Sequence, residues 1–286
     1  MKEKIPFINQ FTAQIKWLGM YGCENMGQAL LSQIFRNKLD RPTKITVVGR
    51  DMYKMGEVEK NYQIQVTDNP DDLKNCEVLI LAFTPQDLEN IPSFYSSKKI
   101  VVSLVPGITI NEIKKKFSYA KYVRAMPNIG IFEGKGMTGL YFDDDMTAKE
   151  KNNILTLFQN GGETLVVKKE SDLDKLGTIS GVGPALFFHF TEILEKAARK
   201  MGFDADDSQL LAQQTFIGAA AVVDGKDDYT VTNWKAKVVS KGGIAEEAVK
   251  ILEKSKLEDT VIKATKAAYD KSKQLGKTKK TSKKKK

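Results

Sequence analysis

Residues Gln14–Gly27 read QIKWLGMYGCENMG, and this stretch decides the fold. An extended apolar run ends at Gly22, and a helical pattern begins at Ala29 and ends near Arg36. A strand, a glycine turn and a helix in this order bind the pyrophosphate of a nucleotide, because the helix N-terminus offers free N–H donors and a positive dipole end. The stretch therefore predicts either a dinucleotide site or an ordinary strand–helix turn. If it is a dinucleotide site, we expect Trp17 to lie close enough for its fluorescence to report binding.

The turn departs from the dinucleotide fingerprint G-x-G-x-x-G at its middle glycine. Glu24 stands where that glycine normally lets the backbone approach the pyrophosphate. A carboxylate at this place adds bulk and repels phosphate. The turn residues that we expect to contact a dinucleotide are Gly22, Cys23, Glu24, Asn25, Met26 and Gly27.

The bulk composition is that of an ordinary globular protein. The 286 residues, 41% of them hydrophobic and 28% charged, are enough for two domains with separate cores. No apolar run reaches the roughly 18–20 residues of a membrane span, and the N-terminus lacks a signal-peptide core, so we expect a cytoplasmic protein. The two cysteines, Cys23 and Cys76, indicate a reduced compartment, and with a single histidine they favour no metal site.

The positive charge of the chain is concentrated at its C-terminus. Lys271–Lys286 (KSKQLGKTKKTSKKKK) holds nine lysines and no acid, which accounts for the whole net charge of +9. Such a composition predicts a disordered tail over residues 276–286. We interpret it as a solvated segment in preference to a tether for nucleic acid or an anionic surface.

Alternating strands and short helices follow the first turn. This alternation predicts an α/β fold, a Rossmann-type doubly wound and mostly parallel sheet over residues 14–167. Helices are expected over 51–60, 109–117 and 148–159. The predicted strands are Lys44–Gly49, Gln63–Val66, Glu77–Phe83, Lys99–Val105, Lys121–Ala125, Met137–Tyr141 and Thr164–Val167.

The sequence pattern changes after about residue 168, and every element predicted beyond that point is a helix. These helices are apolar on more than one face, which indicates burial between subunits. We therefore predict an all-α dimerisation and substrate domain over residues 168–275, and we interpret His189 as a core or interface residue. The helices are expected at Leu186–Met201, Ser208–Val223, Asn233–Val239, Ala245–Glu253 and Leu257–Leu275.

Several short motifs, in order and over both predicted domains, resemble those of the pyrroline-5-carboxylate reductase family. The resemblance runs from about residue 14 to residue 275. The most specific motifs are Met126-Pro127-Asn128, Ser180-Gly181-Val182-Gly183-Pro184-Ala185 and Ser240-Lys241-Gly242-Gly243.

The resemblance implies an enzyme that transfers a hydride from NADPH to the ring C=N of pyrroline-5-carboxylate and so makes proline, the last step of proline biosynthesis. It also implies a homodimer or a larger homo-oligomer, with each active site between the nicotinamide of one subunit and the helical domain of its partner. The cofactor supplies the hydride, and catalysis consists mostly of holding two reactants together. We therefore nominate no general acid.

The other predicted cofactor residues come from three further strand ends. In NAD-type proteins an acid at the end of the second strand binds the ribose 2′-hydroxyl. Gly49 and Arg50 stand there instead, and a guanidinium suits a 2′-phosphate, which favours NADPH over NADH. The resemblance adds two loops, of which the second would border the nicotinamide: Ala82, Phe83, Thr84 and Pro85, and Met126, Pro127 and Asn128.

The substrate residues follow from the resemblance alone. One loop would hold the substrate carboxylate through converging backbone N–H groups. Relatives usually continue this loop with threonine, whereas this chain has Ile244 and Ala245, and Thr84 likewise replaces a family lysine. The predicted substrate residues are Ser240, Lys241, Gly242, Gly243, Ile244 and Ala245.

Two other functions compete with the reductase. A reductase-like paralogue, such as the late-competence proteins, would keep the fold and serve as a binding or regulatory protein. The departures at Glu24, Ile244 and Ala245 favour it. A 3-hydroxyacid dehydrogenase would carry a catalytic lysine on the long helix after the domain junction, and Leu186–Glu195 contains none.

Overall fold

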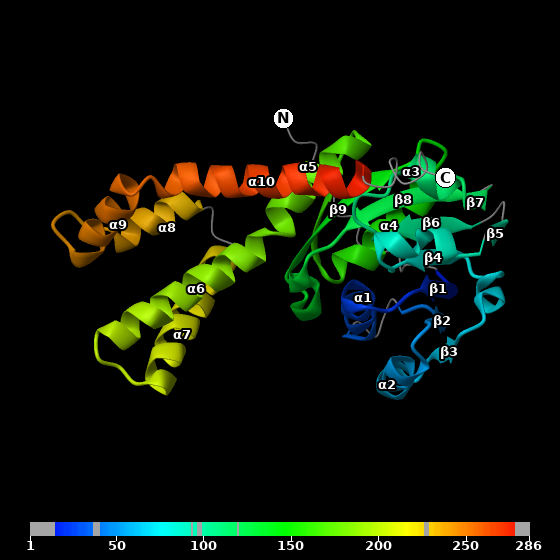
Figure 1. Ribbon diagram of the computed structural model, residues 1–286, viewed down its shortest axis with the longest axis horizontal. Coiled ribbons are helices and arrows are strands. Elements are labelled where there is room, and N and C mark those ends of the chain that lie inside the picture. Colours follow the sequence, from blue (N-terminus) through cyan, green and yellow to red (C-terminus); the bar gives the residue numbers. More distant parts are fainter. Residues whose placement is uncertain are drawn as a thin grey trace, which may run out of the picture. The chain divides into compact units, whose positions relative to one another are not determined.

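The computed structural model describes residues 15–36, 41–92, 94–95, 99–118, 120–225 and 229–277. By its contacts the chain forms two compact units (Figure 1). Of the described residues, the first unit contains those up to Gly181 and those from Tyr269 onward, and the second contains those between Val182 and Ala268. The domain bounds that the sequence predicts, 14–167 and 168–275, stay a prediction.

The first unit is built on an eight-stranded sheet in the order β10-β9-β8-β6-β4-β1-β2-β3. Every neighbouring pair is parallel except β8 and β9, which confirms the predicted doubly wound, mostly parallel sheet. The strands are β1 (Trp17–Tyr21), β2 (Lys44–Val48), β3 (Gln65–Thr67), β4 (Val78–Leu81), β6 (Ile100–Ser103), β8 (Lys121–Met126), β9 (Gly136–Phe142) and β10 (Gly162–Val166).

The strand order reverses at β1. The chain runs from β1 to β2 and β3 on one side, and then crosses back so that β4 pairs with the other side of β1. Tyr21 is in register with Val48 of β2 and with Leu81 of β4, so the three strands end at the same level. In open α/β sheets, ligands bind outside the carboxyl ends of the strands at such a switch point.

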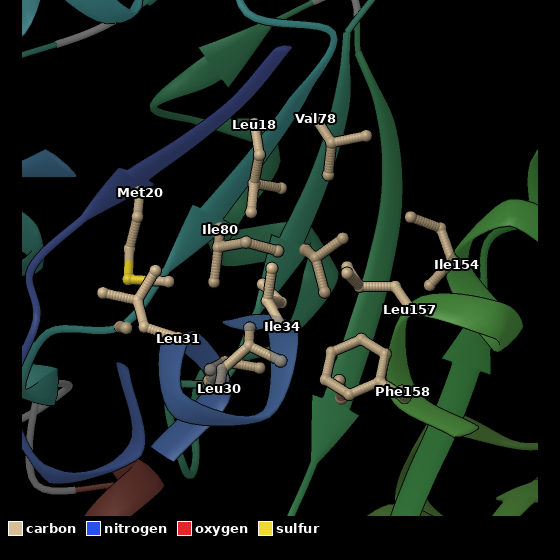
Figure 2. Packing of buried hydrophobic residues seen from close by; sticks show 14 of the residues in the cluster. Leu18, Met20, Leu30, Leu31, Ile34, Val78, Ile80, Ile154, Leu157 and Phe158 are labelled. Atoms are coloured by element: carbon tan, nitrogen blue, oxygen red, sulfur yellow. The ribbon is translucent and has the colours of Figure 1, made fainter. Parts of the chain in front are cut away.

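Helices α1 (Asn25–Arg36) and α4 (Ala148–Gln159) cover one face of this sheet. Figure 2 shows apolar side chains of α1 interdigitating with those of β1 and β4, beside side chains from α4. This packing fixes the N-terminus of α1 at the glycine turn. The labelled residues are Leu18, Met20, Leu30, Leu31, Ile34, Val78, Ile80, Ile154, Leu157 and Phe158, all at most 2% exposed.

A second buried cluster contains side chains from the opposite face of the same strands, such as Tyr21 and Leu81, together with residues of the connecting segments, such as Phe117. Because both faces are covered, the central strands are mostly apolar on both faces. Val78–Leu81, for example, is buried throughout.

Several short elements connect these strands. The predicted helix over 109–117 is shorter, because α3 (Ile110–Lys114) begins at the Thr109 capping box and ends where β7 (Phe117–Ser118) pairs with β5 (Phe94–Tyr95). The remaining short elements are α2 (Met52–Tyr62), α5 (Glu170–Ser180) and the 3₁₀ helices η1 (Pro70–Leu73), η2 (Pro85–Asn90) and η3 (Ile129–Glu133).

The second unit is helical, as predicted. Helices α6 and α7 pack side by side (Figure 1). The ring centroids of Phe187 and Phe216 lie 6.0 Å apart. Helix α10 begins in this unit and continues into the first. The helices are α6 (Gly183–Lys200), α7 (Ala205–Asp224), α8 (Val231–Val238), α9 (Ile244–Lys254) and α10 (Leu257–Lys277).

The apolar faces of these helices are exposed in the single chain. Helix α6 has no buried residue, and Phe187, Phe188 and Phe190 are 61%, 55% and 42% exposed. The interpretation of His189 as a core residue is therefore wrong, since its side chain is 68% exposed and lies 3.4 Å from the Glu192 carboxylate. Its place at an interface between subunits stays a prediction.

The lysine-rich tail is helical where the structure describes it. Helix α10 continues to Lys277, so the predicted disorder is wrong for residues 276 and 277. Residues 278–286 lie outside the described residues. Within the described ranges, no helix combines the length and the hydropathy that crossing a membrane requires.

Candidate functional site

A cleft of about 670 Å³ opens at the carboxyl ends of β1 and β2, beside η2. Its volume is in the range of small-molecule sites, and it lies at the switch point of the sheet. Seven of the predicted cofactor residues meet there. The lining residues are Tyr21, Gly22, Cys23, Glu24, Asn25, Gln28, Val48, Gly49, Arg50, Asp51, Met55, Phe83 and Asp87.

Gly22 makes the turn that forms the floor of the cleft. Its φ is +81°, in the left-handed region that favours glycine, and a Cβ at this position would lie 2.6 Å from the Ala82 carbonyl oxygen. The Gly22 N–H donates to the Val48 carbonyl oxygen at 2.8 Å, and the Ala82 N–H donates to the Tyr21 carbonyl oxygen at 2.9 Å. The turn therefore requires glycine and joins the ends of three strands.

The N-terminus of α1 faces the same cleft. The N–H groups of its first turn, Asn25, Met26 and Gly27, have no acceptor within the helix. Glu24 and Asn25 are exposed at the rim, while Gly27 packs closely, since a Cβ added to it would lie only 3.3 Å from the Gly22 carbonyl oxygen. The donors for an anion are thus present, and the Glu24 carboxylate lies beside them.

Cys23 is buried between these donors and the core. Burial raises the pKa of its thiol to about 12, so the thiol is protonated at neutral pH. Cys76 is also buried and free, and burial raises its pKa as well. Neither cysteine is a nucleophile in this state.

Arg50 forms an ion pair across the cleft with Asp87 of η2. The Thr84 hydroxyl donates to the other carboxylate oxygen of Asp87 at 2.7 Å. Although burial alone would raise it, the hydrogen bonds from Thr84 and Arg50 lower the pKa of Asp87. Asp87 is therefore an anion at neutral pH, fixed between a hydroxyl and a guanidinium.

The loop after β4 contributes one predicted side chain to the cleft. Phe83 packs edge-on against Tyr21, with ring centroids 6.2 Å apart. Ala82, Thr84 and Pro85 do not line the cleft. Thr84 is the N-cap of η2 and acts on the cleft through Asp87.

Met126, Pro127 and Asn128 do not line the cleft either. The Asn128 side chain donates to the Ser180 carbonyl at 2.9 Å and accepts from the N–H groups of Gly130 and Met137, both at 3.1 Å. It thereby ties the end of β8 to β9 and to α5. A contact of these residues with nicotinamide stays a prediction.

The predicted substrate loop lies in the second unit, before α9. Gly242 has φ +75°, and its N–H donates to the Glu246 carboxylate at 2.8 Å. Ser240, Lys241 and Ile244 are exposed, Ile244 to 95%. The Gly243 N–H donates to the Ser240 carbonyl at 3.0 Å. Both glycine donors of the predicted anion site are therefore already paired, one with a carboxylate of α9 and one within the loop.

Sequence reasoning missed some residues of the cleft, among them Asp87, and it placed Trp17 too close to the cleft. The Thr84-to-Asp87 spacing, a capping-box pattern, was the available signal for Asp87. Trp17 lies at the amino end of β1, about 13 Å from the cleft end at 3.3 Å per residue, and its indole donates to Thr46 at 3.1 Å. The expectation that Trp17 lies near the site is wrong.

Comparisons with known proteins agree with this arrangement. Residues 170–275 match the family model described as pyrroline-5-carboxylate reductase dimerisation, and residues 18–107 match that of the coenzyme F420-dependent NADP oxidoreductases. Pyrroline-5-carboxylate reductase from Pasteurella multocida is 30% identical, over 92% of this chain and 99% of the relative. The Synechocystis reductase is 31% identical, over 91% of this chain and 98% of the relative.

Solved structures of two further reductases share the fold. The Coxiella burnetii pyrroline-5-carboxylate reductase has a TM-score of 0.80 and 28% identity, covering 90% of this chain and 97% of that chain. The Plasmodium falciparum pyrroline carboxylate reductase, solved with NADP bound, has a TM-score of 0.78 and 29% identity, covering 93% and 100%. The chain belongs to the pyrroline-5-carboxylate reductase family.

Proposed function

We propose that the chain reduces 1-pyrroline-5-carboxylate to L-proline with NADPH, the last step of proline biosynthesis. The observation that carries the proposal is the switch-point cleft, floored by Gly22, in a chain that aligns with 99% of a curated reductase. The cofactor would supply the hydride, which the ring C=N of the substrate accepts.

The residues of the cleft fit a dinucleotide. The free N–H groups at the start of α1 and the absence of a Cβ at Gly22 suit a pyrophosphate. Glu24 faces solvent at the rim, so its carboxylate can turn away from the phosphates. The proposed cofactor residues are Gly22, Cys23, Glu24, Asn25, Met26, Gly27, Gly49, Arg50, Ala82, Phe83, Thr84, Pro85, Met126, Pro127 and Asn128.

The same cleft supports a preference for NADPH over NADH. Gly49 follows β2 and brings no carboxylate for the ribose 2′-hydroxyl, and a Cβ there would lie 2.3 Å from the Met55 sulfur. The neighbouring Arg50 side chain is 60% exposed and can reach a 2′-phosphate.

The substrate would be held by the loop before α9 of a second subunit. Its backbone N–H groups at Gly242 and Gly243 would bind the substrate carboxylate at the N-terminus of α9, where the helix dipole favours an anion. The substrate would then replace their present acceptors, the Glu246 carboxylate and the Ser240 carbonyl. Ile244 and Ala245 have no hydroxyl for the ring nitrogen, so orientation would depend on the backbone and on excluding water. The exposed apolar faces of α6 to α9 support burial in a homodimer.

An activity assay on the full chain tests this proposal. We expect purified protein to convert pyrroline-5-carboxylate and NADPH into equal amounts of proline and NADP⁺, measured by chromatography of both products. Arg50→Gln should raise the KM for NADPH and leave the KM for pyrroline-5-carboxylate unchanged. The absence of proline at saturating concentrations of both substrates would contradict the proposal.

A second candidate, a reductase-like binding protein without catalysis, is favoured by two carboxylates. Glu24 lies beside the proposed phosphate site, and Glu246 accepts from the Gly242 N–H. If this function is correct, the wild-type chain binds neither ligand, and Glu24→Gly restores NADPH binding.

A further inference from the structure

The guanidinium proposed to recognise a 2′-phosphate is already engaged. Arg50 follows β2 and Asp87 lies in η2 after β4, so their ion pair spans the carboxyl end of β1. Both residues line the same cleft. A phosphate that reaches Arg50 therefore also meets Asp87.

Asp87 is the more firmly held member of the pair. Its carboxylate accepts from the Thr84 hydroxyl at 2.7 Å, and its backbone N–H donates to the Thr84 carbonyl at 2.9 Å. The side chain of Asp87 is 22% exposed, against 60% for Arg50. A phosphate can consequently displace Asp87 from the guanidinium without removing the carboxylate from the cleft wall.

The charges of the cleft oppose an additional phosphate. Among the described residues that line it, Glu24, Asp51 and Asp87 carry carboxylates and only Arg50 carries a positive charge. Arginine binds phosphate best through two parallel N–H groups, and Asp87 competes for this face. NADH carries a ribose hydroxyl in place of the phosphate and meets no such competition.

We propose that Asp87 determines cofactor specificity, because it competes with the 2′-phosphate of NADPH for Arg50. This inference rests on the proposed function and deepens it. Arg50 gives the chain its preference for NADPH, and Asp87 keeps that preference small. Removing the charge of Asp87 should increase the preference about two- to fivefold, the range expected for a partly exposed ion pair.

Two adenylates that differ only in the 2′-phosphate test the proposal without catalysis. Adenosine 2′,5′-bisphosphate and adenosine 5′-monophosphate would be titrated by calorimetry into the full chain and into Asp87→Asn, Arg50→Gln and the double variant. Asp71→Asn is the matched control. Asp71 forms an exposed ion pair with Lys74 in the same unit but outside the cleft, so the substitution removes the same charge without touching the proposed site. Circular dichroism would verify that each variant is folded.

We expect Asp87→Asn to tighten the bisphosphate about two- to fivefold and to leave the monophosphate unchanged. In the Arg50→Gln background this gain should vanish, and Asp71→Asn should not produce it. The role of Asp87 would be overturned if Asp87→Asn left the ratio of the two dissociation constants unchanged. It would also be overturned if Asp71→Asn, or Asp87→Asn in the Arg50→Gln background, gave an equal gain. These outcomes would leave the proposed cofactor site standing. Failure of both adenylates to bind any variant would overturn the cofactor site of the proposed function as well.

Discussion

Gly22 and Ala82 approach so closely that a Cβ on Gly22 would lie 2.6 Å from the Ala82 carbonyl oxygen. Gly22 also has φ +81°, so alanine there is strained even without this contact. We expect Gly22→Ala to lower the free energy of unfolding by about 2–4 kcal/mol, measured by urea denaturation.

Gly56 provides the matched control. It lies within α2, and nothing stands within 4 Å of the Cβ that alanine would add. Gly56→Ala should raise the free energy of unfolding by up to about 1 kcal/mol. Equal effects of the two substitutions would contradict the account of the turn.

Gln33 of α1 is 1% exposed, and among the described residues neither its amide nitrogen nor its amide oxygen has a hydrogen-bond partner. A buried polar group without a partner reduces stability. Gln33→Met, which keeps the length of the side chain, should raise the free energy of unfolding by about 1–3 kcal/mol. A loss of stability in thermal and urea denaturation would show that the amide is paired.

Arg124 of β8 is 3% exposed and joins two carboxylates of α5, Glu170 at 3.2 Å and Asp174 at 3.3 Å. The two acids are contacted by different nitrogens of the planar guanidinium, and the single ammonium nitrogen of a lysine does not reproduce this geometry. We expect Arg124→Lys to cost about 1–2 kcal/mol of unfolding free energy and Arg124→Met about 3 kcal/mol, because the latter leaves both acids without their cation. Similar values for the two variants would mean that only the volume of the side chain matters.

Both carboxylate oxygens of Glu150 accept hydrogen bonds from the Lys121 ammonium, each at 2.7 Å. The same carboxylate completes the Thr147 capping box at the start of α4. Burial would raise the pKa of Glu150, but the hydrogen bonds from Lys121 and Thr147 lower it below the usual 4.5. Its contribution to stability is thus present above pH 4.5 and is lost as the pH falls through the lower, folded-state pKa.

Wild type should therefore lose more stability on acidification than Glu150→Gln, whose side chain does not titrate. Urea denaturation of both proteins from neutral pH to below the usual pKa of Glu150 measures this difference. Parallel pH profiles would contradict the lowered pKa.

The sheet could be predicted from the sequence because its strands are continuous apolar runs. Lys44–Gly49 and Glu77–Phe83 show no alternation, which is typical of strands buried on both faces, and Gly22 marks the turn at the switch point. The two-residue strands Phe94–Tyr95 and Phe117–Ser118 carry no such pattern, and they were missed.

The site was less predictable, because its decisive contacts join distant parts of the chain. The sequence identifies Arg50 as a cation at the end of β2, but its partner Asp87 comes from an element beyond β4. The sequence predicted a core or interface position for His189, and the exposure of its side chain excludes only the core of the single chain. An apolar helix such as α6 has the same sequence pattern whether it is buried in a core or, as here, exposed in the single chain.

The most direct test of the proposed function is a calorimetric titration of the full chain with NADPH. Heat is the suitable signal, since Trp17 lies at the amino end of β1, away from the cleft. We predict micromolar binding with one site per chain, weaker for NADH. Absence of binding at millimolar NADPH in wild type, together with binding in Glu24→Gly, would show that the fold has been kept without its chemistry and would contradict the account.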